Sequence, residues 1–429
     1  MRELRSYNIW TIGCQMNVAD SERLESAMSQ MGLTPAESAQ EADVVVLNSC
    51  VVRQNAEDKV AGMLGTLKPL KSEDPDKIVA LMGCMVGPNT MSLERRFPQV
   101  DVFMRPQQYQ PIIDLLGARM GIDPEGCIGP LTARPDVTAY IPIIHGCDKF
   151  CSFCIIPYRR GREVSRTIPD IARETQLLAE RGVKEVTLLG QNVDSYGHDL
   201  GNDVDLAALL EAVHEADGIE RIRFLTSHPN DMSDRIIDAV AGLEKVCEHV
   251  NLPFQAGDDE VLSRMRRGYT NEEYSALVDK IRSRIPNVSM STDLIVGFCG
   301  ETDDQFERTL DMLRDVRFDK VHSAAYSTRA NTIAARQFED NVPTQEKRAR
   351  LKAVDDLQAD IQTEINSKLK GEVLDVLLEG EKRGKAEGRN RNDKLVYMEN
   401  GLDRVGEVVA VRVDKTSPWS LQGTVVSAQ

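Results

Sequence analysis

Three cysteines stand close together near the middle of the chain. Cys147, Cys151 and Cys154, the central cysteines, share the segment HGCDKFCSFCIIPYRRG at residues 145–161. At such tight spacing one loop supplies several thiolates to an iron–sulfur cluster, and three ligands leave one iron of a four-iron cluster open to a small molecule. A structural zinc site normally takes four protein ligands, and His145 precedes Cys147 by only two residues. The spacing therefore favours an iron–sulfur site, with zinc as the alternative.

A second set of cysteines is spread over the first hundred residues. Cys14, Cys50 and Cys84, the amino-terminal cysteines, each follow closely on a strand-like run, at residues 8–13, 43–48 and 77–83. Their spacings of 36 and 34 residues each fit one strand–helix unit. The carboxyl ends of parallel strands share the edge where open α/β sheets bind ligands. We expect a second cluster site there, with three separate core cysteines as the alternative.

The elements that must position these thiols alternate between strand and helix patterns, which predicts an α/β fold. Residues 1–120 predict an open parallel α/β domain. Residues 138–365 predict six strand–helix units that form a partial (β/α)6 barrel, with its chemistry at the carboxyl ends of the strands. Residues 366–429 show short alternating runs punctuated by glycines, which predicts a small antiparallel β-barrel.

Composition and charge argue against some classes of protein, namely membrane-spanning proteins, secreted proteins and non-specific polyanion binders. No apolar run approaches the roughly 20 residues that span a bilayer, and the initial MRELRSYNIW lacks the apolar core of a secretory signal. We therefore expect a cytoplasmic protein without membrane contact, whose cysteines stay reduced. The net charge of −16 confines any RNA contact to locally basic surfaces.

Two segments are locally basic and are candidate RNA contacts. The alternative for both is a solvated charged face. Their cations are Arg159, Arg160 and Arg162 in the first segment, and Lys382, Arg383, Lys385, Arg389 and Arg391 in the second.

The C-x3-C-x2-C spacing on a β–α barrel resembles the radical S-adenosylmethionine (SAM) superfamily. This resemblance implies that the central cysteines hold a 4Fe–4S cluster, that SAM binds its open iron, and that one electron cleaves SAM to a 5′-deoxyadenosyl radical. Phe153 matches the aromatic position near the SAM adenine in relatives.

Further motifs resemble the methylthiotransferase family over nearly the whole chain. The amino-terminal cysteines lie in IGCQMNVADSE, NSCVVRQNAEDKV and MGCMVG, and the barrel carries GQNVDSYG, TSHP, LPFQAGDDEVLSRMRRGYT and DLIVGFCGET. The late EGRNRNDKLV and SLQG are similar to the TRAM domain, an RNA-binding module. The sequence CQMN at residues 14–17 resembles the branch that acts on isopentenyladenosine in tRNA.

The resemblance implies a transferase that adds a methylthio group to isopentenyladenosine next to the anticodon of tRNA. The amino-terminal cysteines would hold a second 4Fe–4S cluster, and the basic segments would hold the anticodon stem–loop. External electron and sulfur donors are implied, and we expect a monomer. Expected SAM contacts lie at or after predicted strand ends, where each is equally a hydrogen-bonding core residue: Gln191, Ser227, Gln255 and Asp293.

Three positions depart from the family pattern. Cys299 stands where relatives commonly have proline, and Asn331 and Ile333 replace a usual glycine and proline. These changes put in question the shape of loops near the SAM or substrate pocket. The alternatives for function are the same chemistry on a ribosomal-protein aspartate or on threonylcarbamoyladenosine, a non-catalytic iron–sulfur electron carrier or RNA-binding protein, and a zinc-binding RNA module.

Overall fold

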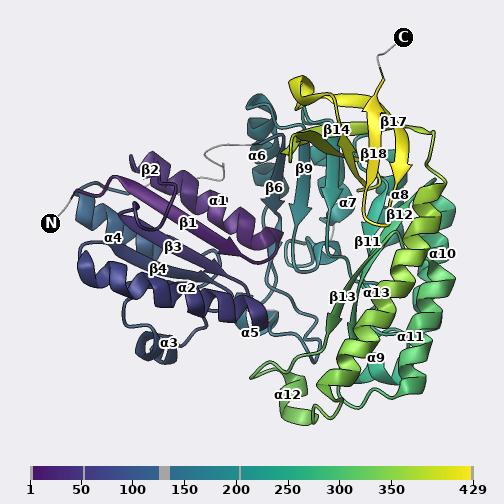
Figure 1. Ribbon diagram of the computed structural model, residues 1–429, viewed down its shortest axis with the longest axis horizontal. Coiled ribbons are helices and arrows are strands. Elements are labelled where there is room, and N and C mark those ends of the chain that lie inside the picture. Colours follow the sequence, from purple (N-terminus) through teal and green to yellow (C-terminus); the bar gives the residue numbers. More distant parts are fainter. Residues whose placement is uncertain (1–2, 52–53, 125–135, 202–203, 427–429) are drawn as a thin grey trace. The chain divides into compact units, whose positions relative to one another are not determined.

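The computed structural model describes residues 3–51, 54–124, 136–201 and 204–426 (Figure 1). It divides into two compact units. The first comprises residues 1–134, 145–148 and 154–164, and the second comprises residues 135–144, 149–153 and 165–429. Among the described residues, no helix has the length and apolar character needed to cross a membrane.

The first unit is built on a five-stranded parallel sheet in the order β2-β1-β3-β4-β5. Its strands are β1 (Ser6–Ile12), β2 (Thr34–Pro35), β3 (Val44–Ser49), β4 (Ile78–Gly83) and β5 (Val102–Met104). Its helices are α1 (Gln15–Gln30), α2 (Gln54–Glu73), α3 (Met91–Arg96), α4 (Gln110–Met120) and α5 (Ile156–Arg160).

Alternation along β3 gives this sheet two covered faces. Val44 and Val46 pack with α1 and α4, whereas Val45 and Leu47 pack with α2. Successive side chains of a strand point to opposite faces, so a continuous apolar strand is typical of a parallel sheet covered by helices on both sides. The predicted open α/β arrangement is confirmed.

The second unit contains two three-stranded parallel sheets, β10-β9-β6 and β11-β12-β13. A parallel bridge between Ile222 and Val246 continues the first sheet toward β11. The strands are β6 (Thr138–Pro142), β9 (Glu185–Leu189), β10 (Arg221–Phe224), β11 (His249–Asn251), β12 (Ser289–Val296) and β13 (Lys320–Ala325). These six strands confirm the predicted partial barrel, since no pairing joins β6 to β13 in the described chain.

Helices alternate with these strands and end in a long connector toward the C-terminus. The helices are α6 (Ile168–Glu180), α7 (Leu206–His214), α8 (Asp234–Gly242), α9 (Asp259–Met265), α10 (Asn271–Arg284), α11 (Asp303–Val316), α12 (Ile333–Gln337) and α13 (Thr344–Ser367). The remaining short elements are β7 (Ile144–His145), β8 (Val164–Ser165), and the 3-10 turns η1 (Val193–Ser195) and η2 (Leu402–Arg404).

The last five strands close into a small barrel in the order β14-β15-β16-β18-β17. They are β14 (Val373–Lys382), β15 (Lys385–Asn390), β16 (Leu395–Met398), β17 (Val408–Thr416) and β18 (Leu421–Val425). The predicted barrel is confirmed, with one difference: β16 pairs with β18 in parallel, while the other pairs are antiparallel. The parallel pair arises because β17 lies between β16 and β18 in the chain and joins the opposite edge of β18.

The small barrel docks on the amino-terminal ends of the partial barrel's strands, within the second unit. Arg221 and Arg223 of β10 donate hydrogen bonds of 2.6–3.0 Å to four backbone carbonyls of β14, β15 and the turn after β15. Arg223 is 5% exposed and also pairs with the equally buried Glu185 at 2.9 Å. The small barrel therefore lies at the end of the partial barrel opposite to the carboxyl ends of the strands.

Candidate functional site

The amino-terminal cysteines lie at one edge of the first unit's sheet. Ile12 of β1 is in register with Ser49 of β3, and Ser49 is in register with Gly83 of β4. Each of the three cysteines follows within two residues of these aligned positions. The sheet order therefore brings the thiols of Cys14, Cys50 and Cys84 to neighbouring loops at the carboxyl edge, as the sequence predicted.

A buried amide network holds the first of these loops against β3. Asn17 Nδ2 donates to Asn48 Oδ1 at 2.9 Å and to the Ser49 carbonyl at 3.2 Å, while Asn48 Nδ2 donates back to the Asn17 carbonyl at 2.7 Å. Cys14 Sγ donates to Asn17 Oδ1 at 3.4 Å. Both asparagines are fully buried. The position of Cys14 is thus fixed relative to the strand that precedes Cys50.

The three thiols interact electrostatically. The pKa of Cys84 is raised to about 11, mainly by burial and also by the neighbouring Cys50 and Cys14, against the lowering effect of Arg160. The Cys84 thiol is therefore neutral near pH 7, so binding iron requires it to release its proton. Mutual repulsion among three thiolates is relieved when a metal cluster accepts them as ligands.

Arg160 supplies a buried cation at these thiols. Its side chain is 1% exposed and pairs with Asp20, also 1% exposed, at 3.1 Å. Burial lowers the pKa of Arg160, but Cys84, Asp20 and Cys14 raise it by more. Its Nε and Nη1 have no hydrogen-bond partner in the described part of the chain. Unsatisfied buried donors beside three thiols fit an anionic iron–sulfur cluster, whose sulfurs would accept from them.

Two of the central cysteines belong to the first unit. Cys147 and Cys154 pack against the apolar cluster that contains Cys84 and Ile155. The Cys147 backbone N–H donates to the Gly161 carbonyl at 3.1 Å. Gly146 has φ of 75°, and a Cβ there would lie 1.9 Å from the Arg162 carbonyl oxygen. Only glycine fits this position, which sets the turn leading into the first central cysteine.

Cys151 is held by the second unit. Arg267 Nη1 donates to Cys151 Sγ at 3.3 Å, and both residues are buried. Arg267 also donates to the Tyr269 hydroxyl and to the Pro253 carbonyl, each at 3.0 Å. Next to the cysteine, the Ser152 N–H donates to the Met265 carbonyl at 3.0 Å. The sequence assigns no role to Arg267, although this residue lies in the motif that ends in MRRGYT.

The expected SAM contacts belong to the second unit, where Asp293 lies within β12 and the others lie in loops. Gln255 bridges to Leu294, and its N–H donates to the Asp293 carbonyl at 3.0 Å. The Asp293 carboxylate accepts from Asn251 Nδ2 at 3.2 Å. Gln191 follows β9, and Phe153 lies in the loop after Cys151; both are partly exposed. Ligand contact by these residues remains a prediction.

Ser227 has a partner that sequence reasoning missed. Its hydroxyl donates to Asp194 Oδ1 at 2.9 Å, and the His228 N–H donates to Asp194 Oδ2 at 3.1 Å. Burial raises the pKa of Asp194 to about 7, although these two hydrogen bonds lower it. The signal was present in GQNVDSYG, where an acid follows a predicted strand end.

The first basic segment divides between interior and surface. Arg162 is 73% exposed and pairs with Asp148 at 2.6 Å. The Arg159 guanidinium lies over Gly87, where a Cβ would come 2.2 Å from Nη1. Arg160 does not meet the expectation of RNA contact, because its guanidinium is enclosed with Asp20 and the amino-terminal thiols.

The second basic segment is largely paired with carboxylates. Lys385 pairs with Glu399 at 2.5 Å, and Lys382 lies 3.8 Å from Glu387. Arg389 pairs with Glu379 at 2.5 Å. Only Arg383 of this segment has no such pair in the described chain.

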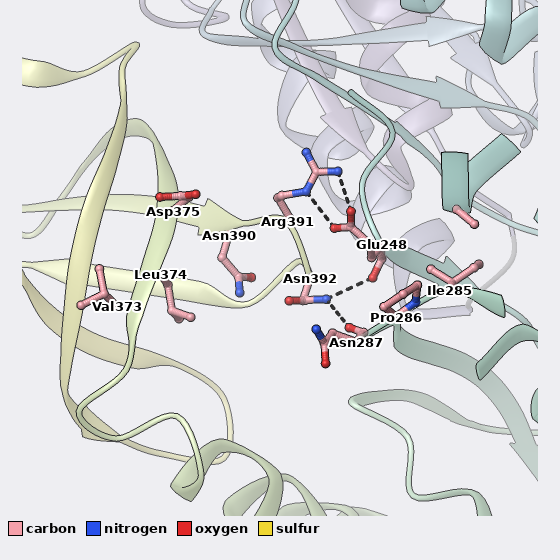
Figure 2. Close-up of a pocket in the computed structure, with 11 residues that line it drawn as sticks. Glu248, Ile285, Pro286, Asn287, Val373, Leu374, Asp375, Asn390, Arg391 and Asn392 are labelled. Atoms are coloured by element: carbon pink, nitrogen blue, oxygen red, sulfur yellow. Dashed lines mark hydrogen bonds and ion pairs between the residues drawn. The ribbon is translucent and has the colours of Figure 1, made fainter. Parts of the chain in front are cut away.

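Arg391 and Asn392 fasten the small barrel to the partial barrel. Figure 2 shows Arg391 reaching across to Glu248, with hydrogen bonds of 2.7 and 2.8 Å. Asn392 donates to the backbone carbonyls of Glu248 and Asn287 at 3.1 and 2.8 Å. These residues line a cavity of 460 Å³ between the two barrels. In this structure Arg391 docks the small barrel through Glu248, and its contact with RNA stays a prediction.

Three families match successive parts of the chain. Residues 6–105 match Uncharacterized protein family UPF0004, residues 141–313 match the Radical SAM superfamily, and residues 367–426 match the TRAM domain. The chain is 46% identical over 421 residues to the tRNA-2-methylthio-N(6)-dimethylallyladenosine synthase of Dehalococcoides mccartyi strain CBDB1, which covers 98% of each chain. The corresponding synthase of Herpetosiphon aurantiacus is 48% identical over 429 residues, or 99% of this chain and 98% of that one.

The chain belongs to the tRNA-2-methylthio-N(6)-dimethylallyladenosine synthase family. This confirms the resemblance to radical SAM methylthiotransferases and the TRAM-like terminal barrel. A radical SAM enzyme of this family uses an iron–sulfur cluster and SAM. Among solved structures, the radical SAM methyltransferase TsrM from Kitasatospora setae has a similar fold, with a TM-score of 0.57 at 14% identity over 90% of this chain and 80% of that chain.

Proposed function

We propose that this chain transfers a methylthio group to isopentenyladenosine next to the anticodon of tRNA, using SAM and two 4Fe–4S clusters. The observation that carries the proposal is the joint presence of near-half identity to such synthases along the whole chain and a second set of three cysteines at one sheet edge. The second set offers a site for the cluster that presents the sulfur.

The two sets of cysteines hold two clusters with different roles. The central cysteines hold the cluster that receives SAM, and the amino-terminal cysteines hold the cluster that presents sulfur. Bound together, a reduced 4Fe–4S cluster and SAM supply a radical able to abstract hydrogen from an unactivated carbon. Because each set offers three thiols, a four-iron cluster held by either set would leave one iron free for an exogenous ligand.

The surrounding side chains position these groups. Arg160 compensates negative charge at the amino-terminal thiols, and Arg267 fixes the orientation of Cys151. Gln255 and Asp293, joined by a backbone hydrogen bond, would bind SAM together with Phe153, Gln191 and Ser227. Asp194 orients the Ser227 hydroxyl and keeps the loop after β10 in place.

The partners follow from this chemistry. Exposed cations of the small barrel and of the segment around Arg162 contact the anticodon stem–loop, and the target adenine is unstacked to reach the reacting carbon. An external reductant and a sulfur donor complete the reaction. We place it in the cytoplasm, where thiolate ligands stay reduced, and we propose that a monomer suffices.

The test is product formation by the anaerobically reconstituted enzyme. It is incubated with SAM, dithionite and tRNA that carries isopentenyladenosine, and the digested nucleosides are examined by mass spectrometry. The proposal predicts the 2-methylthio derivative, and none on unmodified tRNA, on threonylcarbamoyladenosine tRNA or on a ribosomal-protein aspartate. Replacing the amino-terminal cysteines by alanine is expected to abolish the product while SAM cleavage continues. Methylthiolation of another of these substrates instead would refute the assignment.

A further inference from the structure

Trp419 is the most exposed large hydrophobic side chain in the described part of the chain. Its exposed fraction is 59%, ahead of 56% for Met91. It lies at the turn between β17 and β18 of the small barrel, after Pro418. The exposed indole offers a flat aromatic face to solvent, and aromatic faces are the surfaces on which unpaired RNA bases stack.

The turn that carries Trp419 is held rigidly. The Ser417 N–H donates to the Ser420 carbonyl at 2.9 Å, and the Ser420 N–H donates to Ser417 Oγ at 3.1 Å. The buried Asn366 of α13 donates to the Ser417 and Pro418 carbonyls at 2.8 and 3.1 Å. The indole is therefore presented on a fixed support, which lowers the entropy lost when a base stacks on it.

Cations surround this turn on a chain that is acidic overall. Lys368 and Lys370 follow the last turn of α13. The Gly371 N–H donates to the carbonyl of Val413 in β17 at 2.8 Å, and Lys415 lies two residues further along that strand. These three lysines are exposed, and none has an ion-pair partner in the described residues. Arg412 is also exposed and lies 3.6 Å from Asp414.

The hairpin of β14 and β15 contains the basic segment that the sequence favoured for RNA contact. Its cations are less available for phosphate binding than those near Trp419. Most of its cations are paired with carboxylates or used in docking the small barrel. Of the four cations near Trp419, only Arg412 has a carboxylate within ion-pair distance in the described residues, that of Asp414 at 3.6 Å. Phosphate binding draws on unpaired cations, so the charge distribution favours the turn of Trp419.

We propose that the β17–β18 turn is the RNA-contacting face of the small barrel. Trp419 stacks on an unpaired base, and Lys368, Lys370 and Lys415 contact the phosphates on either side of that base. This inference rests on the proposed function, since it takes RNA as the partner. An aromatic platform flanked by unpaired lysines is the arrangement that binds single-stranded nucleic acid.

The test measures affinity for a fluorescently labelled anticodon stem–loop by anisotropy, with the full reconstituted chain. Trp419→Ala is expected to weaken binding about tenfold, within the range for loss of one stacked base, and Trp419→Phe is expected to restore most of it. Lys415→Gln is expected to lower the slope of log affinity against log salt by about one. The matched control Lys385→Gln, on the hairpin, is expected to change both quantities little.

A second readout reports on the indole directly. The chain has two tryptophans, so Trp10→Phe leaves Trp419 as the only indole. Its emission is expected to be quenched as the stem–loop is added. An unchanged emission, with unchanged affinity of Trp419→Ala, would overturn this inference while leaving the proposed function intact. Absence of binding by the wild-type chain would overturn both.

Discussion

Arg267 is expected to set the reduction potential of the cluster held by the central cysteines. Its guanidinium is buried and fixed by three hydrogen bonds, one of them to Cys151 Sγ at 3.3 Å. Hydrogen bonds to ligand sulfurs are among the features that set the potential of an iron–sulfur cluster. A donor stabilises the reduced state more, because that state carries one more negative charge.

The magnitude follows from this single bond. Hydrogen bonds to charged groups contribute about 1.5–3 kcal/mol, and we assign about 1 kcal/mol of this to the difference between the two redox states. For a one-electron couple that difference corresponds to roughly 40 mV. Arg267→Met is therefore expected to lower the midpoint potential by about 40 mV. The Pro253 carbonyl keeps the Tyr269 hydroxyl as a donor at 3.1 Å, which limits the accompanying loss of stability.

The assay is a redox titration followed by electron paramagnetic resonance, in a variant whose amino-terminal cysteines are replaced so that one cluster remains. Arg266→Met is the matched control, because the adjacent Arg266 is exposed. Arg267→Lys is expected to fall between the wild type and Arg267→Met. Equal potentials for Arg267→Met and Arg266→Met, at equal iron content, would refute the role given to the Cys151 hydrogen bond.

Three further predictions concern buried charges. Burial raises the pKa of Asp194 to about 7 in the folded protein, whereas the pKa of an unfolded aspartate is about 4. The free energy of unfolding of the wild type, relative to that of Asp194→Asn, is therefore expected to be greatest below about pH 4. This difference in the free energy of unfolding, measured by urea denaturation, should fall by at most about 4 kcal/mol as the pH rises through 7. A difference that does not change with pH would contradict the prediction. Arg223→Met leaves a buried carboxylate unpaired and is expected to cost about 3–5 kcal/mol, whereas Arg235→Met, at a largely exposed pair, should cost under about 1 kcal/mol. Arg160→Met is expected to lower iron content in a background lacking the central cysteines, and Arg160→Lys to retain more of it.

The parts of the fold that follow from local pattern were predictable from the sequence. Continuous apolar runs such as 44–47 indicate buried parallel strands, and a cysteine after each run places the thiols at one edge. The six strands of the partial barrel follow from the same alternation. The parallel pairing of β16 with β18 was not predictable, because it depends on how the sheet closes and not on alternation within a strand.

Partners of charged residues were the least predictable feature. Arg160 and Arg391 both lie in runs that read as basic surface, yet the first meets Asp20 and the second meets Glu248. These carboxylates lie about 140 residues away in the sequence, so local charge patterns contain no information on the pairing. The same holds for Arg267, whose contact with Cys151 spans 116 residues.

The most direct test of the central claim is the iron and sulfide content of three reconstituted proteins. The wild type is compared with a variant lacking the central cysteines and a variant lacking the amino-terminal cysteines. Two four-iron clusters predict about eight irons in the wild type and about four in each variant. About four irons in the wild type, unchanged when the amino-terminal cysteines are replaced, would contradict the two-cluster account.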